Sequence, residues 1–380
     1  MRHFSEPPRP DSKVLPSNFA PLHAARPMNS TGSLWSDRPL TASIATCVCY
    51  AGVFNDVIGV EEMASRLGLV ERYAFDVALN ELHEQGNIIV QDGFAGLPHL
   101  GDQIATKASK IATARRLIQS RLTSIRRVGR NPIVQFVGIS GSLAAANPVR
   151  DRDNHLDLDI FLITRRTYLW LYRIIFGIRR HLMLWLEPEP ALCASYIMDA
   201  SQLTVMNRNI YTATDIWNLI PVSGFDTYRR FLQANSWVRY YYPGLPAVTA
   251  PGEETASAAT TPIAETALGR LANKCCFLVY AILRSIKWRD LDILKTASFK
   301  TDLHRGTGLE LSANPNGGYQ ALVQKKFGRL AASWFPELLD AELIDKLFPD
   351  QLSAEIRNGD IDAAAVSGNP SLVLDFSKYA

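Results

Sequence analysis

The sequence predicts an α+β protein, with a small mixed sheet at its centre and helical regions before and after the sheet. Two observations support this fold class. Short runs rich in β-branched and aromatic residues, at 132–139, 156–164 and 191–198, predict buried strands. Longer stretches with apolar residues at helical spacing surround these runs. The chain has 380 residues, of which 47% are hydrophobic, so it can hold two or three globular domains.

The pattern along the chain predicts five regions. Residues 1–39 are rich in proline and are expected to form a disordered tail. A compact helical module with a hairpin is predicted at 40–102, and a central domain led by a basic helix at 103–245. A linker rich in Ala, Thr and Pro follows at 246–262. A helical region is predicted at 263–380. Its first helix is expected to bury a stripe of Leu268, Leu271, Phe277, Leu278, Ala281 and Ile282.

The module at 40–102 has the pattern of helices followed by a hairpin. Apolar residues at helical spacing predict helices at 41–54, 60–66 and 72–85. The dipeptide Asp92-Gly93 is a favoured two-residue turn, and it predicts a hairpin over 88–97. This arrangement resembles a winged helix, in which the second helix of the helix–turn–helix pair contacts DNA bases.

The charges of the predicted second helix disfavour that role in DNA recognition. The helix carries Glu71, Asp76, Glu81 and Glu84, against a single arginine, Arg72. DNA phosphates would repel such an acidic face. The net charge of the whole chain is only +3, so its overall field does not point to nucleic acid either. The module is therefore expected to serve for packing or docking.

A long basic helix is predicted at 107–130, directly before the first strand of the central domain. Its apolar residues form one stripe, and basic residues cover much of the rest. The helix is either a solvated connecting element or one wall of a groove that attracts an anionic substrate. Its basic residues are Lys107, Lys110, Arg115, Arg116, Arg121, Arg126, Arg127 and Arg130.

Two short segments of the central domain carry the candidate chemistry. The strand at 132–139 ends at Gly141-Ser142, where a glycine turn opens a helix and leaves backbone N–H groups that suit a phosphate. On the next strand, Asp157 and Asp159 are two residues apart and so project from one face. Leu158, Ile160 and Leu162 line the other face.

Two carboxylates on one face of an apolar strand repel each other unless a cation lies between them. Magnesium commonly takes one or two protein carboxylates together with phosphate oxygens of the substrate. The sequence therefore predicts a magnesium–nucleoside triphosphate site. In it, Gly141-Ser142 would hold the phosphates, and Asp157 and Asp159 would hold Mg²⁺, with Mn²⁺ as a substitute.

This combination resembles the polymerase-beta-type nucleotidyltransferase superfamily, and in particular a bacterial group whose substrate is uncharacterised. The resemblance to the superfamily rests on Gly141-Ser142 followed by Asp157-Leu158-Asp159, with a spacer slightly longer than usual. The resemblance to the bacterial group rests on the later segments 193–199, 211–213 and 228–237, together with Pro221. It implies a small mixed sheet backed by helices and the transfer of a nucleotide to a nucleophile. It also implies a third carboxylate from a later strand, for which Asp199 is the candidate; the alternative is that Asp199 is only an exposed residue at the end of its strand.

Arg165 and Arg166 follow the strand that bears Asp157 and Asp159. Either one could contact the substrate phosphates or only solvate the start of the next helix. The expected function is Mg²⁺-dependent transfer from a nucleoside triphosphate, with ATP favoured, to a small molecule or a protein, with release of pyrophosphate. The alternative is a regulatory protein that senses a nucleotide without turning it over.

Composition and patterning predict a soluble cytoplasmic protein. No signal peptide is recognised, and no run of about 20 apolar residues occurs. The stretch 168–186 comes nearest, but Arg173, Arg179 and Arg180 interrupt it, which leaves peripheral membrane contact open. The five cysteines lack the spacing of a zinc site or a disulfide framework.

Overall fold

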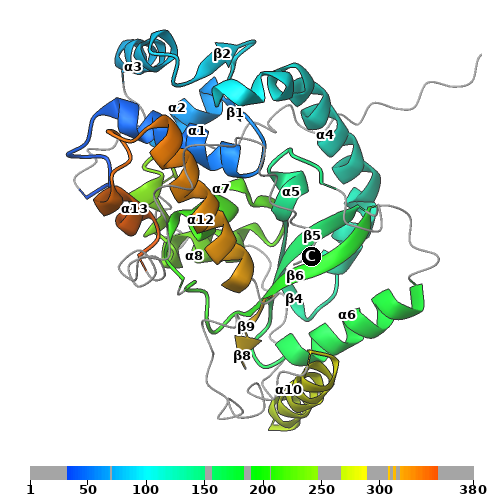
Figure 1. Cartoon of the computed structure of the whole chain (residues 1–380). Helices are drawn as coiled ribbons and strands as arrows, with labels where there is room; N and C mark the ends of the chain where they lie inside the picture. The colour runs from blue at the N-terminus through cyan, green and yellow to red at the C-terminus, as the bar shows by residue number, and fades with distance from the viewer. Residues whose placement is uncertain are drawn as a thin grey trace, which may run out of the picture.

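A computed structural model of the chain shows a mixed α+β architecture, as the sequence predicts (Figure 1). It describes residues 32–68, 71–149, 156–183, 190–205, 207–246, 267–288, 307–308, 311–313 and 317–349. The helices in these ranges are α1 Leu40–Val53, α2 Val60–Leu67, α3 Arg72–Glu84, α4 Gly101–Gly129, α5 Gly141–Ala144, α6 Leu169–Met183, α7 Ile210–Asn218, α8 Phe225–Ala234, α9 Val238–Tyr241, α10 Ala267–Trp288, α12 Gly317–Trp334 and α13 Ala341–Leu347, with a short 3₁₀ turn at Pro98–Leu100.

The strands of the described residues form two sheets. The small sheet has the order β1-β3-β2, and the central sheet has the order β7-β4-β5-β6-β9-β8. In the central sheet β5 and β6 are parallel, and the other neighbouring strands are antiparallel. The strands are β1 Ile58–Gly59, β2 Ile89–Gln91, β3 Phe94–Gly96, β4 Val134–Ile139, β5 Asp157–Thr164, β6 Ala191–Asp199, β7 Ile220–Ser223, β8 Thr307–Gly308 and β9 Leu311–Ala313.

The central sheet separates two hydrophobic cores, because side chains alternate between its faces. On β5, Leu158, Ile160 and Leu162 are fully buried in one core, together with residues of α4, α6 and α10. Phe161 and Ile163 belong to the other core, which includes α7, α8, α12 and the N-terminal module. Asp157 and Asp159 lie on the same face of β5 as Phe161 and Ile163, and both are only partly buried.

The predicted helices and hairpin of the N-terminal module are confirmed. Two residues in the left-handed region, Asp92 with φ 53° and Gly93 with φ 78°, form the turn between β2 and β3. Such a pair of positive φ values is the geometry that the Asp-Gly dipeptide favours in a two-residue hairpin.

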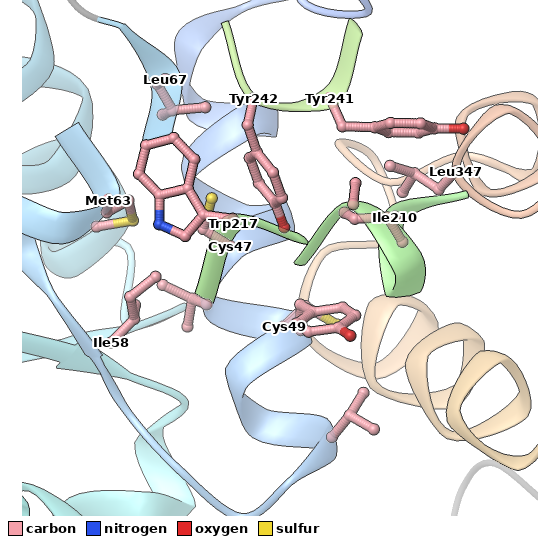
Figure 2. Close-up of a cluster of buried hydrophobic side chains, with 14 of the residues drawn as sticks. Cys47, Cys49, Ile58, Met63, Leu67, Ile210, Trp217, Tyr241, Tyr242 and Leu347 are labelled. Atoms are coloured by element: carbon pink, nitrogen blue, oxygen red, sulfur yellow. The ribbon is translucent and has the colours of Figure 1, made fainter. Parts of the chain in front are cut away.

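This module shares its core with the central domain and with the C-terminal helices (Figure 2). Trp217 of α7 and Tyr242, just after α9, lie beside Cys47 of α1 and Met63 of α2. The buried Arg66 of α2 donates a hydrogen bond of 3.1 Å to Asn218 at the end of α7 and stacks over the Tyr242 ring. These contacts give the module a packing role.

Four sequence-based expectations need correction. The aromatic residues of 211–242 recur at helical spacing, which predicts helix over this stretch, but the stretch contains β7, an edge strand with a proline at position 221. The tail was expected to be disordered up to residue 39, but Leu34 is buried and the Trp35 indole donates a 2.7 Å hydrogen bond to the Tyr241 carbonyl. The C-terminal region was expected to be helical, but it also contributes β8 and β9 to the central sheet.

The predicted core stripe of α10 is only partly buried. Phe277 and Ala281 of the predicted core stripe are buried, whereas the four other members are exposed. These exposed residues are Leu268, Leu271, Leu278 and Ile282. Most of the predicted linker, residues 247–262, lies outside the described residues, as do residues 1–31 of the tail. None of the described helices is long and apolar enough to cross a membrane.

Candidate functional site

The candidate site lies where β4 ends and α5 begins, beside β5 (Figure 1). The Ser140 amide donates a 2.9 Å hydrogen bond to the Asp159 carbonyl, which ties this turn to β5. Gly141 follows with φ +69°, a conformation that costs glycine little because it has no Cβ. A Cβ added at Gly141 would lie 2.3 Å from Asp159 Oδ2. Only glycine therefore fits this turn.

Asp157 and Asp159 project from the same face of β5, as predicted. Asp157 makes an ion pair with Arg180 of α6, whose Nη2 lies 3.3 Å from each carboxylate oxygen. Asp159 lies deeper, and the Cys193 thiol on the neighbouring strand β6 donates a hydrogen bond to it. Burial, followed by the charge of Asp157, raises the pKa of Asp159 to about 6.

A third carboxylate, Asp215 of α7, completes the acidic group. Solvent reaches its side chain, but surrounding protein atoms remove enough of its hydration to disfavour the charged form. This loss of hydration, followed by the charge of Asp159, raises the pKa of Asp215 to about 7. The charge of Asp215 also adds to burial in raising the pKa of Tyr50 and of Tyr196. Asp215 is thus close enough to Asp159 for the two carboxylates to affect each other's charge.

Sequence reasoning missed Asp215 because it looked for the third carboxylate on a strand. One feature could have indicated it. Asp215 is the one charged residue of α7, whose sequence is otherwise apolar or uncharged. The other residues of its turn, Thr214, Ile216 and Trp217, are buried. Asp215 itself is exposed, so the pattern singles out this carboxylate in the sequence but implies no burial cost.

The structure does not bring Asp199 to this site. Asp199 pairs in register with Thr164 at the far end of β5, whereas Asp159 pairs with Cys193. The separation along the strands is about 17 Å at 3.3 Å per residue. The carboxylate of Asp199 accepts hydrogen bonds from the Thr167 amide at 2.7 Å and from the Ser201 amide and hydroxyl at 2.9 and 2.7 Å. It holds a turn in which Thr167 has φ +68°.

Arg165 and Arg166 also lie at this far end of β5. Arg165 Nε donates a 2.6 Å hydrogen bond to the Pro132 carbonyl. The charge of Arg166 acts on Asp199, where it opposes the rise in pKa that burial causes. Among the described residues, Arg180 is a basic side chain that does reach the site, where it pairs with Asp157.

Comparisons give no relative from which roles could be transferred. No family model, no curated protein and no solved structure matches the chain. The assignment of a site therefore rests on the geometry and chemistry of its own residues.

The acidic residues of the site suit the predicted metal only together with a bound substrate. Among the described residues, no three His, Cys, Asp or Glu side chains lie close enough together to hold a metal ion by themselves. Asp157 and Asp159 nevertheless suit Mg²⁺, which binds through one or two carboxylates when substrate phosphates supply further oxygens. Burial and then the charge of Asp157 raise the pKa of Asp159, and a bound cation would offset both by favouring the charged carboxylate.

The long basic helix α4 divides its charges between two environments. Lys107 is buried and its Nζ lies 2.5 Å from Asp56 Oδ2, while Lys110 Nζ lies 3.1 Å from Asn147 Oδ1. These contacts fix α4 against the loop after α1 and the loop after α5. The exposed basic residues of α4 are Arg115, Arg116, Arg126 and Arg127, and Arg130 directly after the helix is also exposed. Lys107 and Lys110 thus have a structural role. The two predicted roles, a solvated face or the wall of a groove, apply to the exposed arginines.

Proposed function

We propose that this chain is a metal-dependent nucleotidyltransferase of the polymerase-beta type. It moves a nucleotide from a nucleoside triphosphate, with ATP as the expected donor, to a small-molecule or protein acceptor. One observation carries the proposal. Gly141 of the predicted phosphate-binding turn packs against Asp159, so the two motif elements form one site although 17 residues separate them. The mixed sheet with β4 and β5 antiparallel supports the same assignment.

Each residue of the site has a role in this proposal. The backbone N–H groups at Gly141 and Ser142 face the triphosphate, since the first turn of a helix leaves its N–H groups without helical partners. Asp157 and Asp159 hold Mg²⁺ or Mn²⁺, which when bound supplies positive charge that offsets the charge of the phosphate oxygens. Asp215 faces the acceptor from α7.

The proposed transfer exchanges one phosphorus–oxygen bond for another. The acceptor hydroxyl oxygen forms a bond to the α-phosphorus, and the bond from that phosphorus to the bridging oxygen of the β-phosphate breaks. Pyrophosphate leaves with the electron pair of the broken bond. Asp215 accepts the proton of the hydroxyl and returns it to solvent. A carboxylate whose pKa is about 7 suits this task near neutral pH.

The N-terminal module supports this function as a docking element. Its order of α1, β1, α2, α3, β2 and β3, with sheet order β1-β3-β2, supports the winged-helix-like assignment. On α3, Arg72 is engaged by Glu61 and Asp76, at 2.6 and 2.9 Å, and Glu81 and Glu84 are exposed. The field of this face disfavours nucleic acid as the acceptor.

A nucleotide sensor without turnover is the second candidate, and the Arg180–Asp157 ion pair favours it. An arginine already neutralises one of the two carboxylates. A chain that only senses a nucleotide could use this cation in place of a metal. Against this candidate, the surroundings of Asp159 and Asp215 in the described part of the chain raise the pKa of both carboxylates, an electrostatic cost that a binding protein has no reason to keep.

A pyrophosphate-release assay tests the proposal. Purified full-length protein is incubated with each of the four ribonucleoside triphosphates, Mg²⁺ or Mn²⁺, and a clarified cell extract as the source of acceptors. We expect metal-dependent release that Asp157→Asn lowers at least about a hundredfold, because metal catalysis contributes several kcal/mol. Asp226→Asn, at an exposed position on α8, is the matched control and should retain full activity. Triphosphate binding without release would favour the sensor, and neither binding nor release would refute both.

A further inference from the structure

The outward face of α10 carries a continuous apolar stripe. Spacings of three and four residues place its members on one side of the helix. On a regular helix they span an arc of about 100°, which is wider than a coiled-coil seam. The members are Leu268, Leu271, Cys275, Leu278, Val279 and Ile282, all exposed, with Leu268 75% and Leu271 58% accessible.

Buried contacts on the opposite side of α10 fix this orientation. Asn273 Oδ1 accepts a 2.7 Å hydrogen bond from the Trp170 amide at the start of α6. The Trp170 ring lies 4.9 Å from the Phe277 ring and 4.7 Å from the Tyr280 ring, centroid to centroid. Because Asn273 and Phe277 are held in this way, the helix cannot rotate its apolar stripe inward without losing a buried hydrogen bond.

The layer formed by α6 and α10 carries positively charged residues and no acidic ones. Figure 1 shows α10 packed beside α6 at one end of the molecule. The two helices contain seven arginines and lysines and no aspartate or glutamate, although acidic residues are nearly as common as basic ones in the whole chain, 37 against 40. On α10, Arg270 and Lys274 are exposed on one flank of the stripe. On α6, Ile175, Ile178 and Arg179 are also exposed.

We propose that α10, together with α6, binds the surface of a membrane that contains anionic lipids. A helix lying in the headgroup region has an aliphatic face, a basic flank and no acidic residue, as α10 has. The length of α10 is about 33 Å, enough to lie along a bilayer surface. A second copy of the chain is a poorer occupant, because its α10 also has no acidic residue that could pair with Arg270 and Lys274. The inference does not depend on the proposed function.

Flotation with lipid vesicles tests this proposal. Full-length protein is mixed with vesicles of phosphatidylcholine alone or of phosphatidylcholine with phosphatidylglycerol. We expect binding to the anionic vesicles, weaker binding at high salt, and little binding to the neutral ones. Leu271→Glu/Leu278→Glu should lower the affinity for anionic vesicles at least tenfold. The matched control is Tyr73→Glu/Val77→Glu, which changes two exposed apolar residues of α3 and should bind like the unmodified protein.

Three outcomes would overturn the proposal. The first is equal binding of both vesicle types, and the second is unchanged binding by Leu271→Glu/Leu278→Glu. The third is that the unmodified protein does not bind vesicles but forms a dimer, which Leu271→Glu/Leu278→Glu dissociates. Light scattering during size-exclusion chromatography detects the dimer. Leu271→Ser/Leu278→Ser is a second, uncharged variant, which should also weaken binding. Thermal unfolding of both variants should match that of the unmodified protein, because the substituted side chains are exposed.

Discussion

Arg180 Nη2 lies 3.3 Å from each carboxylate oxygen of Asp157, so α6 places a cation against the first acidic residue of β5. A metal ion at Asp157 has to compete with this guanidinium. Both side chains are partly exposed, at 31% and 40%, so the pair contributes about 0.2–1 kcal/mol. This small energy makes the ion pair displaceable.

Arg180→Ala is therefore expected to strengthen the binding of Mg²⁺ or Mn²⁺ by up to about fivefold, in line with the energy of a partly exposed pair. Titration calorimetry with the metal alone measures the change. Arg179→Ala removes the neighbouring exposed arginine and controls for the loss of one positive charge. Equal metal affinity in the two variants would show that Arg180 does not compete with the metal.

Gly141→Ala should both destabilise the protein and abolish transfer. The new Cβ would clash with Asp159 Oδ2, and φ +69° strains any residue with a Cβ by about 1–2 kcal/mol. Gly177→Ala on α6 is the matched control, since a Cβ there meets nothing within 4 Å. Gly177→Ala should leave the free energy of unfolding unchanged or raise it slightly, because alanine forms helix better than glycine. Urea unfolding and pyrophosphate release measure both effects. A fully active Gly141→Ala variant would refute the role of this turn.

Asp215→Asn should slow turnover by about 10²–10⁴-fold if Asp215 accepts the proton of the acceptor. Affinity for the triphosphate should change little, because the nucleotide contacts in the proposal come from other residues. Asp226→Asn serves again as the control, since Asp226 is exposed on α8. Steady-state kinetics separate the two effects. A variant that loses nucleotide affinity while keeping its turnover rate would assign Asp215 to binding instead.

Asp199→Ala should affect stability and spare catalysis. The substitution removes the acceptor of three hydrogen bonds and leaves the Thr167 turn unsupported. We expect a loss of about 2–4 kcal/mol in the free energy of unfolding. Turnover measured well below the melting temperature should remain close to that of the unmodified protein. A normally stable variant without turnover would restore Asp199 to the catalytic group that the sequence suggested.

The raised pKa of Asp159 predicts a pH dependence of stability. In the native state this carboxyl binds its proton more tightly than in the unfolded chain, since its pKa rises from 3.8 to about 6. Its contribution to stability is therefore complete below pH 4 and is lost as the pH rises toward 6. Asp159→Asn avoids this loss, so without metal it should exceed the unmodified protein by up to about 3 kcal/mol at pH 8.

The same comparison at pH 3.5 should show almost no difference between the two proteins. Urea unfolding at both pH values, in the presence of a chelator, measures the effect. The rate of nucleotide transfer should instead increase with pH, because Asp159 and Asp215 act in their ionised forms. Activity is expected to rise through about pH 6–7. A gain in stability that is equal at both pH values would contradict the raised pKa.

Local patterns in the sequence were enough to predict most elements near the site. The alternation around Asp157 and Asp159 placed both on one face of β5, and the Asp92-Gly93 turn predicted its hairpin. Elements without a local pattern were missed. The edge strand β7 has four residues and contains a proline, and β9 pairs with a strand more than a hundred residues away. Pairing over such distances is not encoded in periodicity.

The sequence by itself determined the glycine turn and the two carboxylates of β5, because backbone conformation and side-chain alternation are local properties. Only the tertiary structure decided which other side chains join them. Asp215 and Arg180 come from helices that pack near β5, and Asp199 is kept away by the length of β6. Tertiary packing also decided which face of α10 is buried, since its apolar residues occur on both sides and the buried contacts of Asn273 and Phe277 select one.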